Sequence, residues 1–387
     1  MPKTSIFKKI LLGIATFFAA IILLIYATGY DYLFNGIKLT YLRGEKSATI
    51  DDGTFFKKNI ISRGFPQEWQ KDSLYNKTPL SPALIKNLRQ THTASLLVVK
   101  NGKLIHEQYW DSYGTYKQSN SFSVAKAITV MLLGKAIEDG KISNVRQAFT
   151  DWYPNFGNGD ERAKKMTLLD LASMQSGYDW SEHYKSPFQP NAKAYYGDNL
   201  AETTLRRGMK EQPAKRFEYL SGNTQLLGFA VRKAVGIPLA YYASEKLWKP
   251  LGMESDAYWI TDEYKMEKTF CCVHAIPRDF AKLGQLLLQN GTWNGKQLLS
   301  TDFVATITTP TTLSKGAYGA GLWTNYDHAE KHFFFWGILG QYIIVIPEKQ
   351  LVIVRTGSDQ NITTDTKGRS THVAFLVENI VKLFSKK

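Results

Sequence analysis

The chain has 387 residues, of which 44% are hydrophobic and 13% aromatic. This composition is that of a globular protein with a sizeable core, and it excludes a disordered or low-complexity chain. The formal net charge is +14, but the lysines and arginines are scattered and form no basic run, so we do not expect nucleic acid as a partner.

The first 29 residues form a segment of their own. Lys3, Lys8 and Lys9 precede an uncharged run over 10–27, which has about the length that spans a bilayer. Positive charge before such a run predicts the N-terminus inside and the bulk of the chain outside. We expect 1–29 to be an uncleaved signal anchor in the cytoplasmic membrane, with the rest on the periplasmic or extracellular side. The alternative is a cleaved signal peptide and a secreted protein.

The segment 30–80 is polar, rich in aromatic residues and weakly periodic, and we interpret it as a stalk and an N-terminal wrap. Two strands follow, over 94–100 and 103–109, joined by Asn101-Gly102. That dipeptide between alternating apolar residues predicts a hairpin with a type I′ turn.

An almost wholly apolar helix is predicted after Ser123, and such a helix is typical of the middle of a domain. Residues 141–270 are predicted to be mostly helical and rich in loops. Beyond them we expect a helix over 279–289, a second hairpin around Glu348-Lys349, and a closing helix over 371–384.

Strands at both ends of this stretch and helices between them predict an α+β domain over 81–387. In it, an antiparallel sheet is flanked by helices and carries an inserted, mostly helical lobe at about 141–270. Cys271 and Cys272 are the only cysteines, and a bond between neighbours is rare and strained, so we expect no disulfide framework. No metal-binding or cofactor-binding motif occurs, so neither is expected.

Ser123 and Lys126 form an S-x-x-K pair at the start of the apolar helix. A spacing of three places both side chains on one helix face, one turn apart. A serine hydroxyl needs a base beside it to act as a nucleophile, and a lysine serves if burial or another cation lowers its pKa. A solvated helix face is the usual explanation of a chance match, and the apolar surroundings argue against it here.

Two later segments supply possible partners. Tyr219-Leu-Ser221 contains a tyrosine that can shuttle a proton if nearby cations, such as Lys126, depress its pKa. Trp336-Gly337-Ile338 precedes the second hairpin, and its glycine allows backbone N–H groups to approach a substrate closely.

In this order, the three segments resemble the S-x-x-K, Y-x-N and K-T-G motifs of the serine-reactive penicillin-recognising superfamily. That superfamily comprises class C β-lactamases, DD-peptidases and their esterase and amidase relatives. The chain is most similar to its 6-aminohexanoate-dimer hydrolase branch, over about 80–384. The stretches that carry this finer resemblance are Ser123-Val-Ala-Lys126, Met174-Gln-Ser-Gly-Tyr-Asp-Trp180, Tyr219-Leu-Ser-Gly-Asn-Thr-Gln-Leu-Leu-Gly228, Arg278-Asp-Phe-Ala-Lys-Leu-Gly284 and Gly340-Gln-Tyr-Ile-Ile-Val-Ile-Pro347.

The resemblance implies a serine hydrolase that cleaves small amides or esters without a cofactor. Ser123 would be acylated, Lys126 would be the base, and Tyr219 would pass a proton to the leaving group. Backbone N–H groups of Ser123 and Ile338 would form the oxyanion hole. The remaining positions that the resemblance assigns to oxyanion or substrate binding are Gly337, Tyr184, His274, Trp323 and Ser221.

Two departures from the family pattern bear on the substrate. The lysine of K-T-G is missing, and Ser221 stands where β-lactamases usually have asparagine. Both argue against strong β-lactamase activity. A DD-peptidase or β-lactamase remains the alternative among enzymes, and a non-catalytic binding or sensor module is the alternative of another class. Ordinary packing is the alternative role for His274 and Trp323.

Overall fold

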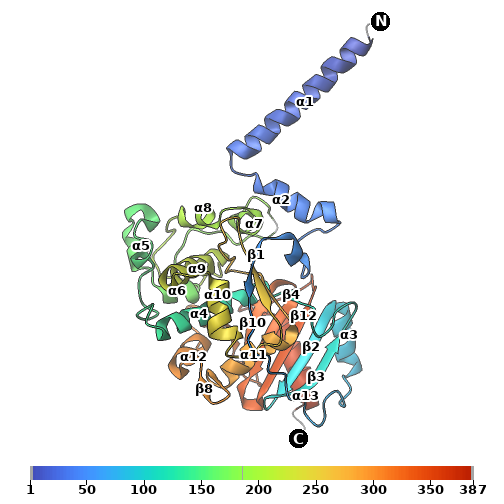
Figure 1. Cartoon of the computed structure of the whole chain (residues 1–387), viewed down its shortest axis with the longest axis vertical. Coiled ribbons are helices and arrows are strands. Elements are labelled where there is room, and N and C mark those ends of the chain that lie inside the picture. The colour runs from blue at the N-terminus through green and yellow to red at the C-terminus, as the bar shows by residue number, and fades with distance from the viewer. Residues whose placement is uncertain (1–2, 185, 385–387) are drawn as a thin grey trace.

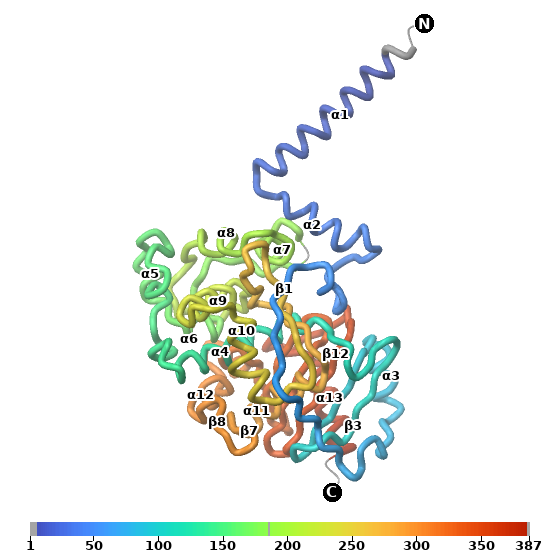
Figure 2. Tube along the Cα trace, viewed as in Figure 1, coloured from blue at the N-terminus to red at the C-terminus, as the bar shows by residue number. Residues whose placement is uncertain are grey.

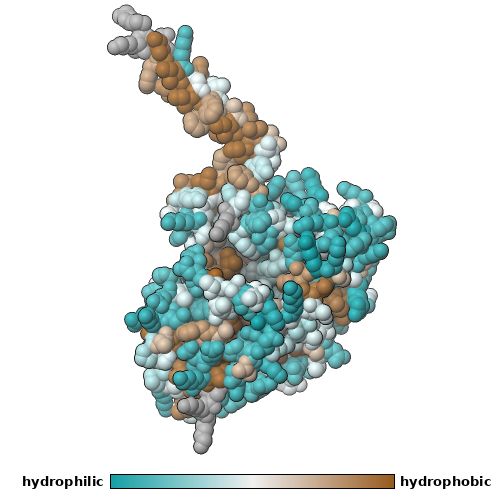
Figure 3. Space-filling view, turned by 180° about the vertical axis from the view of Figure 1, so that it is seen from behind, coloured by the Kyte–Doolittle hydropathy of each residue, from teal (hydrophilic) through white to brown (hydrophobic). Residues whose placement is uncertain are grey.

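The computed structural model describes residues 3–184 and 186–384. Helix α1 (Lys3–Ala27) stands away from the folded body, and α13 (Thr371–Phe384) lies toward the opposite end (Figure 1). Apolar residues cover α1, whereas most of the surface of the body is polar (Figure 3). In the described part of the chain, α1 is the one helix long and apolar enough to cross a membrane, a property that signal sequences share.

A six-stranded antiparallel sheet organises the body, with strand order β3-β2-β12-β11-β10-β9. Both predicted hairpins are confirmed, and Asn101 and Gly102 have the positive φ values, 49° and 73°, that a type I′ turn needs. The strands are β2 (Thr93–Lys100), β3 (Lys103–Tyr109), β9 (Trp323–Asn325), β10 (His332–Gly337), β11 (Gln341–Ile346) and β12 (Leu351–Gly357).

Helices cover both faces of this sheet, and successive side chains of a strand point to opposite faces. Leu97 and Val99 face a core shared with α4 (Val124–Glu138) and α11 (Pro277–Leu288). Leu96 and Val98 face a second core, against α3 (Pro82–Gln90) and α13. The predicted α+β architecture, a sheet flanked by helices, is confirmed.

Helices dominate the chain between α4 and the second half of the sheet. The long helix α9 (Ser221–Val235) packs against α4. The shorter ones are α5 (Glu161–Lys165), α6 (Leu168–Ala172), α7 (Pro190–Tyr196), α8 (Leu200–Leu205) and α10 (Leu239–Ala243). After α11 come the short strands β7 (Thr292–Trp293) and β8 (Lys296–Gln297) and helix α12 (Thr301–Thr308).

A second, four-stranded sheet was not predicted from the sequence. Its order is β1-β5-β6-β4, and it joins the N-terminal segment to the body, since β1 lies beside β5 (Figure 2). The N-terminal segment also forms α2 (Tyr32–Leu39), which contacts α7. The strands are β1 (Lys58–Ile61), β4 (Ser119–Asn120), β5 (Ala257–Ile260) and β6 (Val273–Ala275).

Candidate active site

A tight turn between β4 and α4 presents Ser123. Phe122 adopts a left-handed backbone conformation, with φ of 44°. The backbone N–H of Phe122 donates to the side-chain oxygen of buried Asn120 at 2.9 Å, which holds the turn. A non-glycine residue in this region is strained, and such strain is found at functional sites when the surroundings enforce it.

The hydroxyl of Ser123 is not used as a helix cap. Ser123 occupies the N-cap position of α4, where a serine side chain usually accepts from the backbone, but it makes no such bond. Instead Ser123 Oγ lies within hydrogen-bonding distance of Lys126 Nζ, at 2.8 Å. The lysine is 1% exposed, and burial lowers its pKa to about 8, against a smaller rise caused by the charge of Glu182.

Two further groups bind the amine of Lys126. Its Nζ lies 3.2 Å from Ser221 Oγ, at the first residue of α9, and 2.9 Å from the carbonyl oxygen of Phe270. The packing of α9 on α4 therefore brings the second predicted segment to the first.

Tyr219 lies against the same serine. Burial raises the pKa of its hydroxyl well above the usual range, and a hydrogen bond to Ser123 lowers that pKa by a smaller amount. The sequence made a proton-shuttle role for Tyr219 conditional on a pKa depressed by nearby cations, and this condition is not met, because desolvation of the phenolate raises the pKa. The ring centroid of Tyr219 is 5.0 Å from Lys126 Nζ and 5.3 Å from the ring of Trp323.

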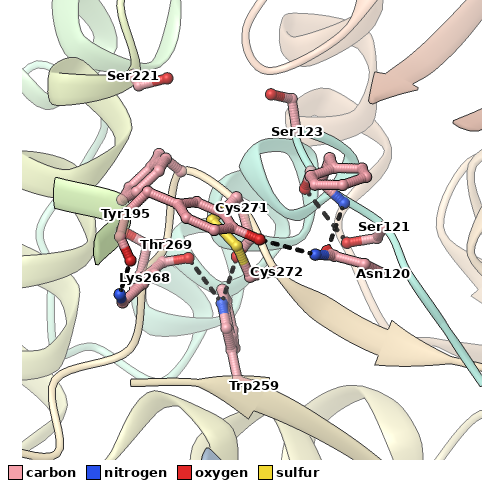
Figure 4. Close-up of a disulfide and its surroundings, with 12 residues drawn as sticks. Asn120, Ser121, Ser123, Tyr195, Ser221, Trp259, Lys268, Thr269, Cys271 and Cys272 are labelled. Atoms are coloured by element: carbon pink, nitrogen blue, oxygen red, sulfur yellow. Dashed lines mark hydrogen bonds between the residues drawn. A yellow bond between two sulfur atoms is a disulfide. The ribbon is translucent and has the colours of Figure 1, made fainter. Parts of the chain in front are cut away.

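A cavity of about 440 Å³ opens beside Ser123, a size typical of small-molecule sites. Ser123, Ser221, Tyr184 and Ile338 line it, and Figure 4 shows Ser123 and Ser221 on either side of the space above the cysteine pair. Among the described residues that line it, none is lysine, arginine or histidine, and the one charged side chain is Asp359.

The third predicted segment closes one side of this cavity. A Cβ atom on Gly337 would lie 2.2 Å from the carbonyl oxygen of Ser121, so only glycine lets β10 approach the turn that presents Ser123 this closely. Trp336 lines the cavity, whereas Trp323 packs behind it, 5.1 Å from Trp336 between ring centroids.

The sequence profile of the Beta-lactamase family matches residues 82–377. The chain belongs to this family. It is 23% identical over 238 residues to a 6-aminohexanoate-dimer hydrolase of Paenarthrobacter ureafaciens, a match that covers 58% of this chain and 59% of that protein. Over 184 residues, 42% of either chain, it is 23% identical to an Escherichia coli protein provisionally assigned as a D-alanyl-D-alanine carboxypeptidase. The chain thus spans about half the length of these curated relatives.

The fold is likewise that of solved structures of this family. A Bacillus anthracis protein provisionally assigned as a 6-aminohexanoate-dimer hydrolase superposes with a TM-score of 0.74 at 23% identity, covering 86% of this chain and 92% of that one. At this identity the likeness establishes the fold and leaves the chemistry to the residues of the site.

His274 does not join the other predicted residues. It lies in β6, and its ring stacks on Tyr258 with centroids 4.5 Å apart, outside the residues that line the cavity. Burial lowers its pKa to about 3, so it is a neutral core histidine. The substrate contact that the family resemblance implied for His274 is therefore wrong, and the alternative role, ordinary packing, is the one that the structure shows.

Glu182 was missed by the sequence analysis. It lies in the loop between α6 and α7, and it accepts hydrogen bonds from the hydroxyl and the backbone N–H of Ser221 at 2.6 and 2.8 Å. The one available signal was its position next to the Met174–Trp180 stretch that carried the family resemblance.

The two cysteines are bonded to each other, contrary to expectation. Cys272 has a left-handed backbone, with φ of 78°, which folds the chain back on itself. The indole N–H of Trp259 donates to the carbonyls of Lys268 and Cys271 at 2.9 Å each and holds this turn (Figure 4). Cys271 lines the cavity, and Phe270, whose carbonyl binds Lys126, directly precedes it.

Proposed function

We propose that the chain is a serine hydrolase that cleaves uncharged amides or esters through an acyl-enzyme on Ser123. The observation that carries the proposal is the hydrogen-bonded group of Ser123, Lys126 and Ser221 at the edge of a cavity whose described lining includes no cationic side chain. Most chance S-x-x-K pairs lack a buried lysine with a lowered pKa and a cavity of substrate size.

In the first half-reaction, neutral Lys126 accepts the proton of Ser123 as Oγ attacks the carbonyl carbon of the substrate. The backbone N–H groups of Ser123 and Ile338 would stabilise the oxyanion. Tyr219, whose raised pKa keeps it protonated, donates a proton to the departing amine or alcohol and regains one from Lys126. Water then enters, and the same groups act in reverse to release the acid.

The nucleophile is tested with Ser123→Ala. We expect turnover of a p-nitrophenyl ester to fall by several orders of magnitude, since a covalent route loses its nucleophile. A fluorophosphonate probe should add mass to the peptide that contains Ser123. Labelling of another serine would refute the assignment, and a wild-type chain that neither labels nor turns over the ester would favour a non-catalytic module.

The substrate class follows from charge. In the lactam-cleaving relatives, the K-T-G lysine pairs with a substrate carboxylate. This chain has Trp336 at that place, whose indole ring is apolar apart from one N–H donor. Desolvating an unpaired carboxylate costs a few kcal/mol. We therefore expect kcat/KM for a cephalosporin to lie at least about a hundredfold below that for an uncharged ester. A better cephalosporin than ester substrate would favour the β-lactamase or DD-peptidase alternative.

We also propose that residues 1–29 anchor the protein in the cytoplasmic membrane and that 30–80 form a stalk and an N-terminal wrap. Residues 81–387 would form the hydrolase domain on the outer side of that membrane. The length and apolar surface of α1 support this. N-terminal sequencing of membrane-extracted protein tests it, and a mature chain that begins near residue 30 in the soluble fraction would indicate cleavage.

A further inference from the structure

Glu182 binds the residue that contacts the lysine base. Its Oε1 accepts from the hydroxyls of Ser221 and Tyr184, and its Oε2 accepts from the backbone N–H of Ser221 at 2.8 Å and from the indole N–H of Trp180 at 2.9 Å. A carboxylate offers about four acceptor positions, and here four donors fill them. It therefore has no capacity left for a cationic substrate.

We propose that Glu182 is a positioning residue: it orients the hydrogen bonds around Lys126 so that the lone pair of the neutral amine faces Ser123. The proposal rests on the proposed function, in which Lys126 is the base. It concerns which group donates in each hydrogen bond around Lys126, and not only that Ser123, Lys126 and Ser221 lie close together.

The direction follows from counting protons. A neutral lysine amine has two N–H bonds and one lone pair, and Lys126 has three partners: Ser123, Ser221 and the carbonyl of Phe270. The carbonyl can only accept, so it takes one N–H. The hydroxyl of Ser221 has a single proton.

That single proton is committed to Glu182. Ser221 Oγ lies 2.6 Å from Glu182 Oε1, the distance of a charge-assisted O–H···O⁻ bond, which is about twice as strong as a neutral one. Toward Lys126, Ser221 can then only accept, and it takes the second N–H. The lone pair is left for the hydroxyl of Ser123, which is the arrangement that proton transfer requires.

Glu182→Gln should reverse one bond while keeping the shape of the side chain. Two N–H groups, from Ser221 and Trp180, donate to Oε2 in the wild type and need an acceptor there. In the variant, the amide oxygen must therefore occupy the position of Oε2. The amide NH₂ group then faces the hydroxyl of Ser221 and donates to it. The proton of Ser221 is freed to turn to Lys126 and to compete with Ser123 for the lone pair.

The test is a double-mutant cycle of Glu182→Gln and Ser221→Ala, with kcat and KM for p-nitrophenyl acetate measured separately on the high-pH plateau, where Lys126 is neutral. We expect Glu182→Gln to cost about a hundredfold in kcat, the lower end of what a positioned base contributes. In the Ser221→Ala background, position 221 has no hydroxyl to compete with Ser123 for the lone pair of Lys126. Adding Glu182→Gln there should lower kcat by less than about threefold.

Two further measurements separate positioning from general structural or charge effects. Glu182→Asp keeps an acceptor-only carboxylate and should stay within about tenfold of wild type. Because the charge of Glu182 raises the pKa of Lys126, the midpoint of the pH–rate profile should move to lower pH in Glu182→Gln. The matched control is Glu218→Gln, at a half-buried acid next to Tyr219 that pairs with Arg216, and it should change neither quantity.

Equal losses from Glu182→Gln in both backgrounds, a change confined to KM, or wild-type kcat would each overturn the proposal. If circular dichroism shows that Glu182→Gln is unfolded, Glu182→Met replaces it in the cycle with the same expected loss, because methionine also leaves the proton of Ser221 uncommitted. Wild-type turnover and labelling at Ser123 test the proposed function separately. An active wild type with an equally active Glu182→Gln refutes only the positioning role.

Discussion

Lys126 on α4 and Lys282 on α11 are buried to the same extent, each about 1% exposed, and burial lowers the pKa of both. Their partners differ in kind. Lys282 Nζ donates to the carbonyls of Gln67 and Gly252 at 2.6 Å each, and Glu254 lies 4.0 Å away. Carbonyl and carboxylate oxygens carry no proton to give up, so Lys282 can only hold segments of the chain together.

Lys126 instead faces two hydroxyl groups, one of which has a proton to transfer. The size of the pKa shift does not make this distinction, since burial also lowers the pKa of Lys268 to about 8, and that lysine donates to the carbonyl of Tyr195. What marks a buried lysine as a base is therefore the chemistry of its neighbours, and a perturbed pKa alone is insufficient.

The strongest test of this contrast replaces each lysine by methionine, which has a similar shape. Lys126→Met should lower kcat/KM for a p-nitrophenyl ester by about 10³–10⁴, because the general base is lost. It should lower the free energy of unfolding less than the loss of Lys282 does, since one buried carbonyl, that of Phe270, loses its donor instead of two. Steady-state kinetics and urea denaturation of the same preparation measure both quantities.

Lys282→Met should show the opposite pattern. Two buried carbonyls lose their donor, and Glu254 and Asp279 lose a neighbouring positive charge. We expect the free energy of unfolding to fall by about 3 kcal/mol, while kcat of the folded fraction stays within about threefold of wild type. If Lys282→Met instead lost most of its kcat while its free energy of unfolding stayed at the wild-type value, the proposed difference between Lys126 and Lys282 would be wrong.

The pH dependence gives a smaller but more specific effect. Lys126 must be neutral to act as a base, and its pKa is about 8. The rate should therefore rise with pH, about tenfold per unit below pH 8, and level off above it. Tyr219 adds no descending limb near pH 9, because burial raises its pKa well above the usual range. A profile already flat from pH 6 would mean that Lys126 is not the titrating base.

The features of this molecule that could be predicted are those that depend on residues close together in the sequence. Ser123 and Lys126 lie within one helical turn, and the hairpins follow from alternation and turn residues, so the hairpins of the main sheet and the contact between Ser123 and Lys126 were predicted. The second sheet was missed because its strands have only two to four residues. Glu182 and the carbonyl of Phe270 reach Ser221 and Lys126 through tertiary packing, which no local pattern encodes.

The smallest effect concerns the third partner of Lys126. The carbonyl of Phe270 precedes the bonded pair Cys271–Cys272, and opening that ring lets the carbonyl drift from the amine. We expect the double variant Cys271→Ser/Cys272→Ser to lose about tenfold in kcat/KM, less than the hundredfold that an ångström of misplacement can cost. A phosphine reductant should lower wild-type activity to the same level.

The double variant serves as the control for the reductant, which should leave it unchanged because it has no bond to break. Alkylation followed by mass spectrometry counts the thiols released in the wild type. If two alkylated cysteines appear while kcat/KM stays constant, the carbonyl of Phe270 is held by the turn itself and by Trp259, which bonds the carbonyls on either side of it in the chain. The direction of the lone pair of Lys126 would then depend on Ser221 and Glu182, and not on the cysteine pair.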